Sequence, residues 1–125
     1  MKHVILVADD DFDNRTIAQE VLETAGYDVC VATNGEETWE KINSHQPEVV
    51  LLDLSMPKLN GWDIARRVRQ HAELNDVVLI AFTAHALVGE ELKAKAAGCN
   101  DYLAKPCLPK DILNFVAKWI RVRHP

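Results

Sequence analysis

Five short apolar segments alternate with five segments of helical periodicity along this 125-residue chain. The apolar segments are residues 4–7, 29–32, 49–52, 77–82 and 102–104. They are apolar almost throughout instead of alternating with polar residues, which predicts strands that are buried on both faces. Strands of this kind, separated by helices, are typical of an α/β fold in which a parallel sheet lies between two layers of helices.

The segments between the strands carry apolar residues at the three- and four-residue spacing of a helix. These residues are Ile17, Ala18, Val21, Leu22 and Ala25, then Trp39 and Ile42, then Trp62, Ala65 and Val68, then Leu87, Val88, Leu92 and Ala96, and finally Ile112, Leu113, Val116 and Ile120. Gly26 and Gly98 follow the first and fourth helix, where a positive φ is favoured. Gly35 and Gly61 each follow an asparagine, and Asn-Gly pairs are typical of turns. No Pro-rich or low-complexity segment interrupts the pattern, so we expect one domain over residues 1–125.

Composition restricts the classes of function. Hydrophobic residues make up 48% of the chain and charged residues 26%, as in soluble globular proteins. The longest apolar run is too short to cross a membrane, and the N-terminal residues show no signal-peptide pattern. The formal charge of −5 argues against unspecific binding to nucleic acids. The three cysteines lack a C-x-x-C spacing, which favours reduced thiols. We therefore expect a cytoplasmic protein that binds neither a membrane nor, directly, nucleic acid.

Polar side chains follow four of the five predicted strands. Asp9 and Asp10 come after the first strand, Asp53 after the third, Thr83 after the fourth and Lys105 after the fifth. With right-handed crossovers all strands of such a sheet point the same way, so these side chains are expected to meet at one edge. That edge is where open α/β sheets bind their ligands.

The chemistry of this set favours a metal ion and a phosphoryl group. Two carboxylates about 4 Å apart repel by about 4 kcal/mol at an effective dielectric constant of about 20, so the cluster should hold a proton or bind a cation. Ligands that are all oxygen favour Mg²⁺ over zinc or copper. Asp53 can attack phosphorus and form an acyl phosphate. The metal ion and Lys105 would neutralise the charge that develops, and Thr83 can donate a hydrogen bond to the phosphoryl group.

Four short motifs resemble those of the receiver domain of the two-component response-regulator family. They are ILVADD (5–10), LLDLSMPKLNG (51–61), FTA (82–84) and GCNDYLAKP (98–106). The resemblance covers essentially the whole chain. It implies a flavodoxin-like (βα)5 three-layer sandwich with strand order 2-1-3-4-5, and a signalling phosphoprotein of the chemotaxis-regulator type rather than an enzyme.

The resemblance also implies roles for the residues that follow the strands. Asp53 would accept a phosphoryl group from a partner histidine kinase or histidine phosphotransfer protein. Mg²⁺ would be held by Asp10, Asp53 and the main-chain carbonyl of Ser55, with Asp9 assisting through a water molecule.

The same resemblance implies a switch. A phosphoryl group adds about −1.5 to −2 charges and three strong acceptors. Thr83 would move toward it, and Tyr102 would turn into the vacated space. The surface formed by residues 87–96, 102–104 and 112–120 would then change and dock a downstream protein.

The resemblance and the sequence assign roles to a few further residues. Ser55 and His85 occupy positions that tune the lifetime of the phosphoryl group in the family. The Lys105–Pro106 bond should be cis, as in the family. Asp11 and Asp13 are interpreted as acids at the start of the first helix, with Asp11 either in its first turn or capping it.

Three other functions compete with this one. A flavin-binding flavodoxin is disfavoured because an acidic first loop repels a phosphate. A Mg²⁺-dependent aspartyl phosphatase of the haloacid dehalogenase type wants a second aspartate where this chain has Ser55. A receiver-like docking module that works without phosphorylation stays open. We expect the kinase to contact the first helix near Asn14, Ile17 and Ala18, and the protein to be a monomer or weak dimer.

Overall fold

The computed structural model describes residues 2–56, 58, 60–84 and 89–124. Within these ranges strands and helices alternate as predicted, and all strand pairs are parallel. The elements are β1 (Val4–Ala8), α1 (Phe12–Thr24), β2 (Asp28–Ala32), α2 (Gly35–His45), β3 (Val49–Leu52), α3 (Gly61–Arg69), the 3-10 helix η1 (Ala72–Leu74), β4 (Val78–Thr83), α4 (Glu90–Ala97), β5 (Asp101–Ala104) and α5 (Pro109–Arg123). The strand order β2-β1-β3-β4-β5 is the expected one.

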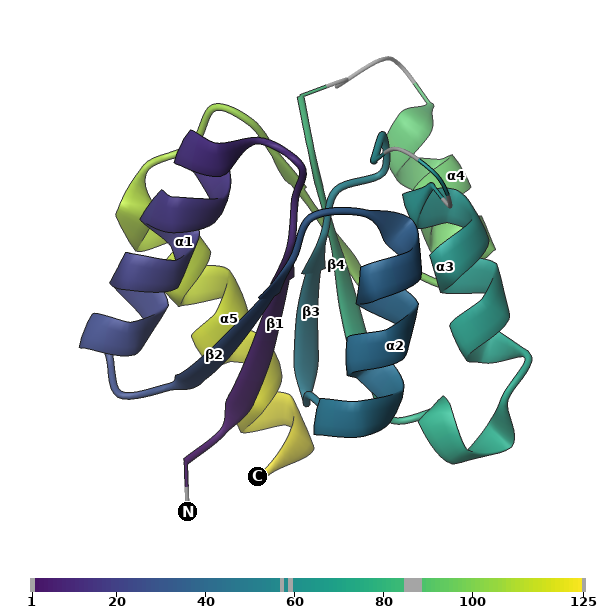
Figure 1. Cartoon of the computed structure of the whole chain (residues 1–125), viewed down its shortest axis with the longest axis horizontal. Coiled ribbons are helices and arrows are strands. Elements are labelled where there is room, and N and C mark those ends of the chain that lie inside the picture. The colour runs from purple at the N-terminus through teal and green to yellow at the C-terminus, as the bar shows by residue number, and fades with distance from the viewer. Residues whose placement is uncertain (1, 57, 59, 85–88, 125) are drawn as a thin grey trace.

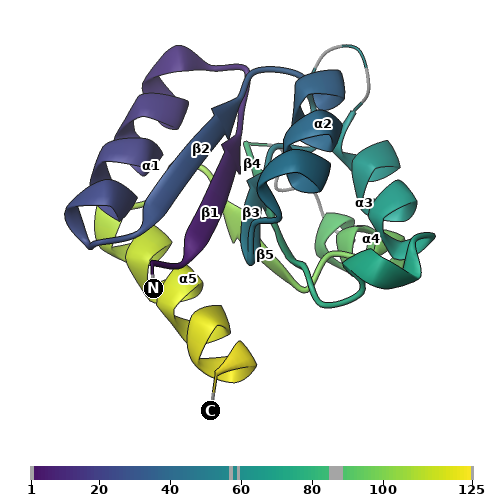
Figure 2. The same ribbon diagram turned by 60° about the horizontal axis from the view of Figure 1, so that its bottom comes forward.

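Helices cover both faces of the sheet (Figures 1 and 2). Leu6 and Leu79 lie on the face covered by α2, α3 and α4, whereas Ile5 and Ile80 lie on the face covered by α1 and α5. Neighbouring residues of one strand divide between the two layers because successive side chains point to opposite faces. Burying each such side chain stabilises the fold by about 1.5–3 kcal/mol. The predicted three-layer sandwich is therefore confirmed.

The expectation that every strand is buried on both faces is wrong for the edge strands. β3 and β4 are buried throughout. In β2 Asp28 is exposed and the next three residues are only partly buried, because this strand has a neighbour on one side alone. The apolar sequence of β2 resembles that of the central strands and does not reveal this position.

The helix boundaries agree in part with the sequence. Asp11 caps α1, and its side chain accepts a hydrogen bond from the Asn14 main-chain N–H. Gly26 and Gly98 have φ values of 98° and 120°, as expected for residues that follow helices. Asp13 lies in the first turn of α1, where an acid interacts favourably with the helix dipole.

The two Asn-Gly pairs do not form turns, which corrects that prediction. Asn34 and Asn60 cap α2 and α3, accepting hydrogen bonds of 2.9 and 3.0 Å from the main-chain N–H groups of Glu37 and Asp63. The glycine of each pair is the first residue of the helix. An asparagine oxygen satisfies an otherwise unpaired N–H at a helix start, and here this use prevails over the turn.

The predicted apolar face of the fourth helix is also wrong. Leu92 is 74% exposed and Ala96 is exposed as well, whereas Ala94 and Ala97 are buried. Leu87 and Val88 lie outside the described residues. The small alanine side chains occupy the space against the rest of the fold, so the larger leucine points to solvent although it is the more hydrophobic residue.

The cysteines agree with the expectation of free thiols. Cys30, Cys99 and Cys107 form no disulfide, and burial raises the pKa of each thiol, to about 11 for Cys99. Every helix among the described residues is too short or too polar to cross a bilayer.

Candidate functional site

The acids meet because β1 and β3 are neighbours in the sheet. The Asp53 N–H donates to the Ala8 carbonyl at 2.9 Å and the Asp9 N–H to the Ala32 carbonyl at 3.0 Å, so the main-chain ladder continues just beyond the strands. Asp9, Asp10 and Asp53 each contribute a carboxylate oxygen to a cluster whose ligand atoms lie within 4.8 Å of one another. The cluster lies at the carboxyl edge, the edge of the sheet where the strands end.

Lys105 brings a positive charge to this cluster. Its Nζ lies 2.5 Å from Asp9 Oδ2 and 3.7 Å from Asp53 Oδ2, and its side chain is only 9% exposed. The Lys105 N–H donates to the Thr83 carbonyl at 2.8 Å, and Nζ lies 4.8 Å from the centroid of the Phe82 ring. The expected cis bond to Pro106 is present. Removing one partner from a buried ion pair typically costs about 3–5 kcal/mol, which makes this pair part of the fold as well as of the site.

The two oxygens of Asp53 have different partners. Oδ1 accepts hydrogen bonds from the Ser55 N–H at 3.0 Å and from the Ser55 hydroxyl at 3.1 Å. Oδ2 is the oxygen nearer Lys105. Ser55 therefore orients the carboxylate and leaves Oδ2 on the side of the ammonium group.

Asp9 is fully buried and held from two directions. Its Oδ1 accepts a hydrogen bond of 2.9 Å from the Asp11 N–H, and its carbonyl accepts one of 3.0 Å from Arg15 Nη1. Asp10 is exposed. The cluster thus has a buried side at Asp9 and a side open to solvent at Asp10.

The three carboxylates differ in acidity. Burial raises the pKa of Asp9 although Lys105 opposes it, and burial together with the neighbouring Asp53 raises the pKa of Asp10. Burial acts in the same direction on Asp53, but the Ser55 hydrogen bonds and the Lys105 charge outweigh it, so its pKa lies below the ordinary value. Asp53 is therefore the carboxylate of the three whose ionised form the fold favours.

Gly61 is essential to the shape of the site. A Cβ at this position would lie 2.5 Å from the Asp53 carbonyl oxygen and 2.6 Å from Leu54 Cα. The Gly61 N–H donates to the Leu54 carbonyl at 3.2 Å. The start of α3 therefore packs directly on the main chain that carries Asp53, and no larger residue fits without a shift.

The expected switch residues lie on the neighbouring strands β4 and β5. Thr83 is fully buried at the end of β4. Tyr102 is partly buried, and its hydroxyl donates to Glu90 Oε1 at 3.1 Å. Burial, with Glu90 beside it, raises the pKa of Tyr102 to about 12. His85 lies outside the described residues.

Two of the three residues at which we expect the kinase to contact α1 are accessible to a partner, and one is not. Ile17 is 48% exposed and Asn14 is partly exposed, but Ala18 is fully buried and packs in the core beneath α1. Phe12, which the sequence reasoning did not consider, is 68% exposed at the start of the same helix.

Four contacts of the site were not predicted. They involve Arg15 at the Asp9 carbonyl, Phe82 beneath the Lys105 ammonium, Glu90 at the Tyr102 hydroxyl and Gly61 against Asp53. Gly61 and Phe82 stand within the motifs and could have been found from those positions. Arg15 and Glu90 follow no spacing rule that the sequence displays.

Comparison with known proteins agrees with this geometry. The family model of the response regulator receiver domain matches residues 5–117. The "Probable transcriptional regulator ycf27" of Porphyridium aerugineum is 37% identical over 111 residues, which cover 89% of this chain and 45% of that protein, so the chain spans less than half of this relative's length.

Two solved structures extend the likeness over nearly the whole chain. A putative response regulator from Chloroflexus aurantiacus is 31% identical, with a TM-score of 0.91 over 97% of this chain and 99% of that one. The receiver domain of the sensor histidine kinase PA1611 from Pseudomonas aeruginosa, solved with a magnesium ion coordinated in its active-site cleft, is 30% identical, with a TM-score of 0.87 over 96% and 98%. The motifs, the strand order and the acidic cluster have one explanation: this chain belongs to the response regulator receiver domain family of two-component systems.

Proposed function

We propose that this chain is a phosphoacceptor switch in which Asp53 takes a phosphoryl group from a histidine kinase or a histidine phosphotransfer protein. The observation that carries the proposal is the convergence of three carboxylates and the Lys105 ammonium group at the carboxyl edge of the sheet. We infer that one receiver domain fills residues 1–125, since the alternation of elements continues from β1 to α5.

The transfer step follows from the two oxygens of Asp53. Oδ2 attacks the phosphorus of the donor's phosphohistidine, the new O–P bond forms, and the N–P bond breaks on the opposite side. The imidazole nitrogen leaves with the bonding electrons and takes a proton from solvent. Lys105 stabilises the charge on the transferring oxygens, and Thr83 donates a hydrogen bond to the bound phosphoryl group. The hydrogen bonds of Ser55 to Oδ1 keep Oδ2 directed at the incoming group.

The donor set fits Mg²⁺. The clustered side-chain ligands are all carboxylate oxygens, which this ion prefers. Asp10, Asp53 and the main-chain carbonyl of Ser55 would hold the ion, and Asp9 would assist through a water molecule. When bound, Mg²⁺ supplies positive charge that screens the carboxylates from the incoming phosphoryl group. The magnesium ion in the related receiver domain of PA1611 supports this assignment.

The output surface is proposed to be formed by α4, β5 and α5. The hydrogen bond from Tyr102 to Glu90 joins β5 to α4, so movement of either residue reaches this surface. Phosphorylation would draw Thr83 toward the phosphoryl group and let Tyr102 move inward, and a downstream protein would bind the changed surface.

Exposed Phe12 and Ile17 on α1 are proposed to contact the phosphodonor. Ser55, beside the Asp53 oxygens, and His85 are proposed to tune the lifetime of the phosphoryl group.

Treatment with acetyl phosphate tests the proposal. Wild-type protein is expected to gain the mass of one phosphoryl group when Mg²⁺ is present and none after chelation. Asp53→Asn should gain nothing under either condition, because an amide is not a nucleophile for this step. Asp13→Asn, which removes another acid close to the site, is the matched control and should behave as wild type.

Two outcomes would count against the proposal. Equal labelling of wild type and Asp53→Asn would place the phosphoryl group on another residue. No labelling of wild type, combined with unchanged partner binding after addition of beryllium fluoride, would favour a docking module that works without phosphorylation.

A further inference from the structure

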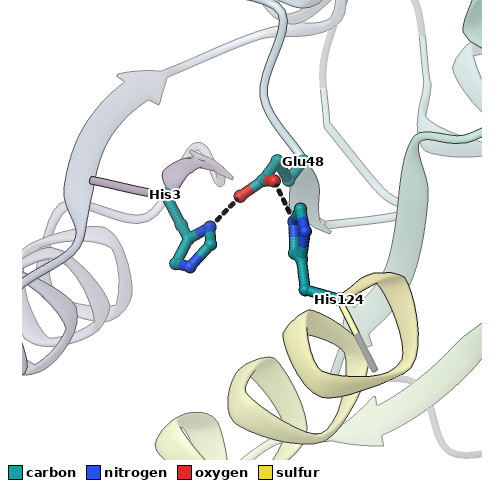
Figure 3. Close-up of side chains that lie close together, drawn as sticks. All are labelled: His3, Glu48 and His124. Atoms are coloured by element: carbon teal, nitrogen blue, oxygen red, sulfur yellow. Dashed lines mark hydrogen bonds and ion pairs between the residues drawn. The ribbon is translucent and has the colours of Figure 1, made fainter. Parts of the chain in front are cut away.

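A second group of potential metal ligands lies at the opposite edge of the sheet, where the strands begin. His3 Nδ1 lies 2.6 Å from Glu48 Oε2, and His124 Nε2 lies 2.6 Å from Glu48 Oε1 (Figure 3). Each of the three residues offers one possible ligand atom, and these three atoms lie within 4.8 Å of one another. Three distant parts of the chain therefore direct donor atoms at one point.

Main-chain hydrogen bonds fix the positions of these residues. The His3 carbonyl accepts a bond of 2.9 Å from the Asp28 N–H, which extends the β1–β2 pairing. Glu48 is held on two sides: its N–H donates to Val4 at 2.9 Å and its carbonyl accepts from Val78 at 3.0 Å. This part of the site is thus built on the rigid edge of the sheet.

His124 comes from the end of α5. Its N–H donates to the Ile120 carbonyl at 3.0 Å, and the preceding residue, Arg123, hydrogen-bonds the carbonyl of Asp76. Figure 1 places both chain ends at this edge of the molecule. The imidazole of His124 is thereby held over Glu48 beside that of His3, with ring centroids 5.1 Å apart.

The donor set differs in kind from that of the acidic cluster. Two imidazole nitrogens and one carboxylate suit Zn²⁺, which binds such ligands at about 2.0–2.2 Å. The side chains of His3, Glu48 and His124 are 37%, 19% and 50% exposed, which leaves room for water to complete the coordination. Although burial opposes it, the hydrogen bonds from His124 and His3 lower the pKa of Glu48, so the carboxylate is ionised and available.

We propose that His3, Glu48 and His124 form a binding site for a divalent transition-metal ion, with Zn²⁺ as the matching ion, which joins the end of α5 to the beginning of the sheet. The ion takes the place of the hydrogen-bonding protons between the imidazoles and Glu48. Each imidazole then offers a nitrogen lone pair to the metal, and any displaced proton passes to solvent.

Calorimetric titration with Zn²⁺ tests this site on the full chain without a histidine tag. Mg²⁺ is kept in excess so that the acidic cluster is occupied. Wild type should bind one Zn²⁺, and His3→Gln, His124→Gln and Glu48→Gln should each weaken binding at least about tenfold. His45→Gln, which removes an exposed histidine outside the group, is the matched control and should leave the affinity unchanged. Binding of Co²⁺ should give the visible absorption bands of an imidazole-ligated ion, and these bands should be lost in the same three variants.

Zn²⁺ binding by variants of each site distinguishes this site from the proposed phosphorylation site. Asp53→Asn should bind Zn²⁺ as wild type does. A wild-type chain that binds no Zn²⁺, or histidine variants that bind it as well as wild type, would overturn the proposal. Loss of Zn²⁺ binding in Asp53→Asn would place the ion in the acidic cluster and would also overturn it. Circular dichroism of each variant identifies any loss of fold, and a variant that misfolds is replaced in the comparison by another of the three.

Discussion

Among the single residues outside the acidic cluster, Tyr102 shows a clear shift in pKa, to about 12. Burial disfavours the charged phenolate, and the carboxylate of Glu90, which accepts a hydrogen bond from the neutral hydroxyl, repels the phenolate as well. The folded state therefore holds the Tyr102 proton more tightly than the unfolded chain does. The stabilisation is complete below the ordinary tyrosine pKa of 10.0 and is lost as the pH rises through the folded-state pKa of about 12.

Replacing Glu90 by glutamine should lower the pKa of Tyr102 from about 12 toward 10.0, although burial keeps part of the shift. The physical reason is that the amide carries no charge to repel the phenolate. Ultraviolet titration in a Tyr27→Phe background isolates Tyr102, since the chain has two tyrosines. Glu91→Gln, which removes a more distant charge on the same helix, is the control and should shift the pKa less. Identical titration curves for Glu90→Gln and its parent would show that the hydrogen bond has no influence on the phenol.

Among the elements, α3 has the closest connection to the site. Its first residue, Gly61, packs on the main chain of Asp53 and Leu54, so the position of the helix and the position of the Asp53 carboxylate depend on each other. Main-chain atoms cannot rotate out of the way as a side chain can. A substitution here therefore moves either the helix or Asp53.

Gly61→Ala should lower the free energy of unfolding by about 1–3 kcal/mol, the usual cost of inserting a group into a packed region. It should also slow phosphorylation by acetyl phosphate, because Asp53 is displaced. Gly26→Ala is the contrasting variant: it has a φ of 98° and no atom within 4 Å of a new Cβ, so it should cost roughly 1–2 kcal/mol in backbone strain and leave phosphorylation unchanged. Urea unfolding and the rate of mass gain measure the two effects. A normal rate for Gly61→Ala would show that the contact does not position Asp53.

The elements also show what the sequence could and could not predict. Continuous apolar runs revealed β3 and β4 because burial on both faces excludes polar residues from nearly every position of these strands. The face of α4 was mispredicted because its buried residues are alanines, whose hydrophobicity is too small to dominate a periodic pattern. The capping roles of Asn34 and Asn60 were missed because an Asn-Gly pair suits a turn and a helix start alike.

At the scale of the whole molecule, the acidic cluster weakens the metal-free fold. Asp9, Asp10 and Asp53 converge on one Lys105, so negative charge exceeds positive charge there. The sequence predicted this convergence because parallel strands end at a common edge. It did not predict that Lys105 lies closer to Asp9 than to Asp53, since side-chain distances depend on packing that no motif encodes.

Asp10→Asn should therefore raise the melting temperature in the absence of Mg²⁺ by a few degrees, because one repelling charge is gone. Mg²⁺ should stabilise wild type, by about 2.7 kcal/mol at one hundred times its dissociation constant, and should stabilise Asp10→Asn much less. Differential scanning calorimetry with and without Mg²⁺ measures both changes, with Asp13→Asn as the control that retains the full response. An equal Mg²⁺ response in Asp10→Asn would exclude this residue as a ligand.

The pairing of Lys105 with Asp9 has a consequence for synthesis of the chain. The two residues are 96 positions apart, and the lysine directly follows β5. A product of interrupted translation that stops before this residue carries the acids but lacks the ammonium group that pairs with them. The acidic cluster therefore acquires its counter-charge only after synthesis has passed β5.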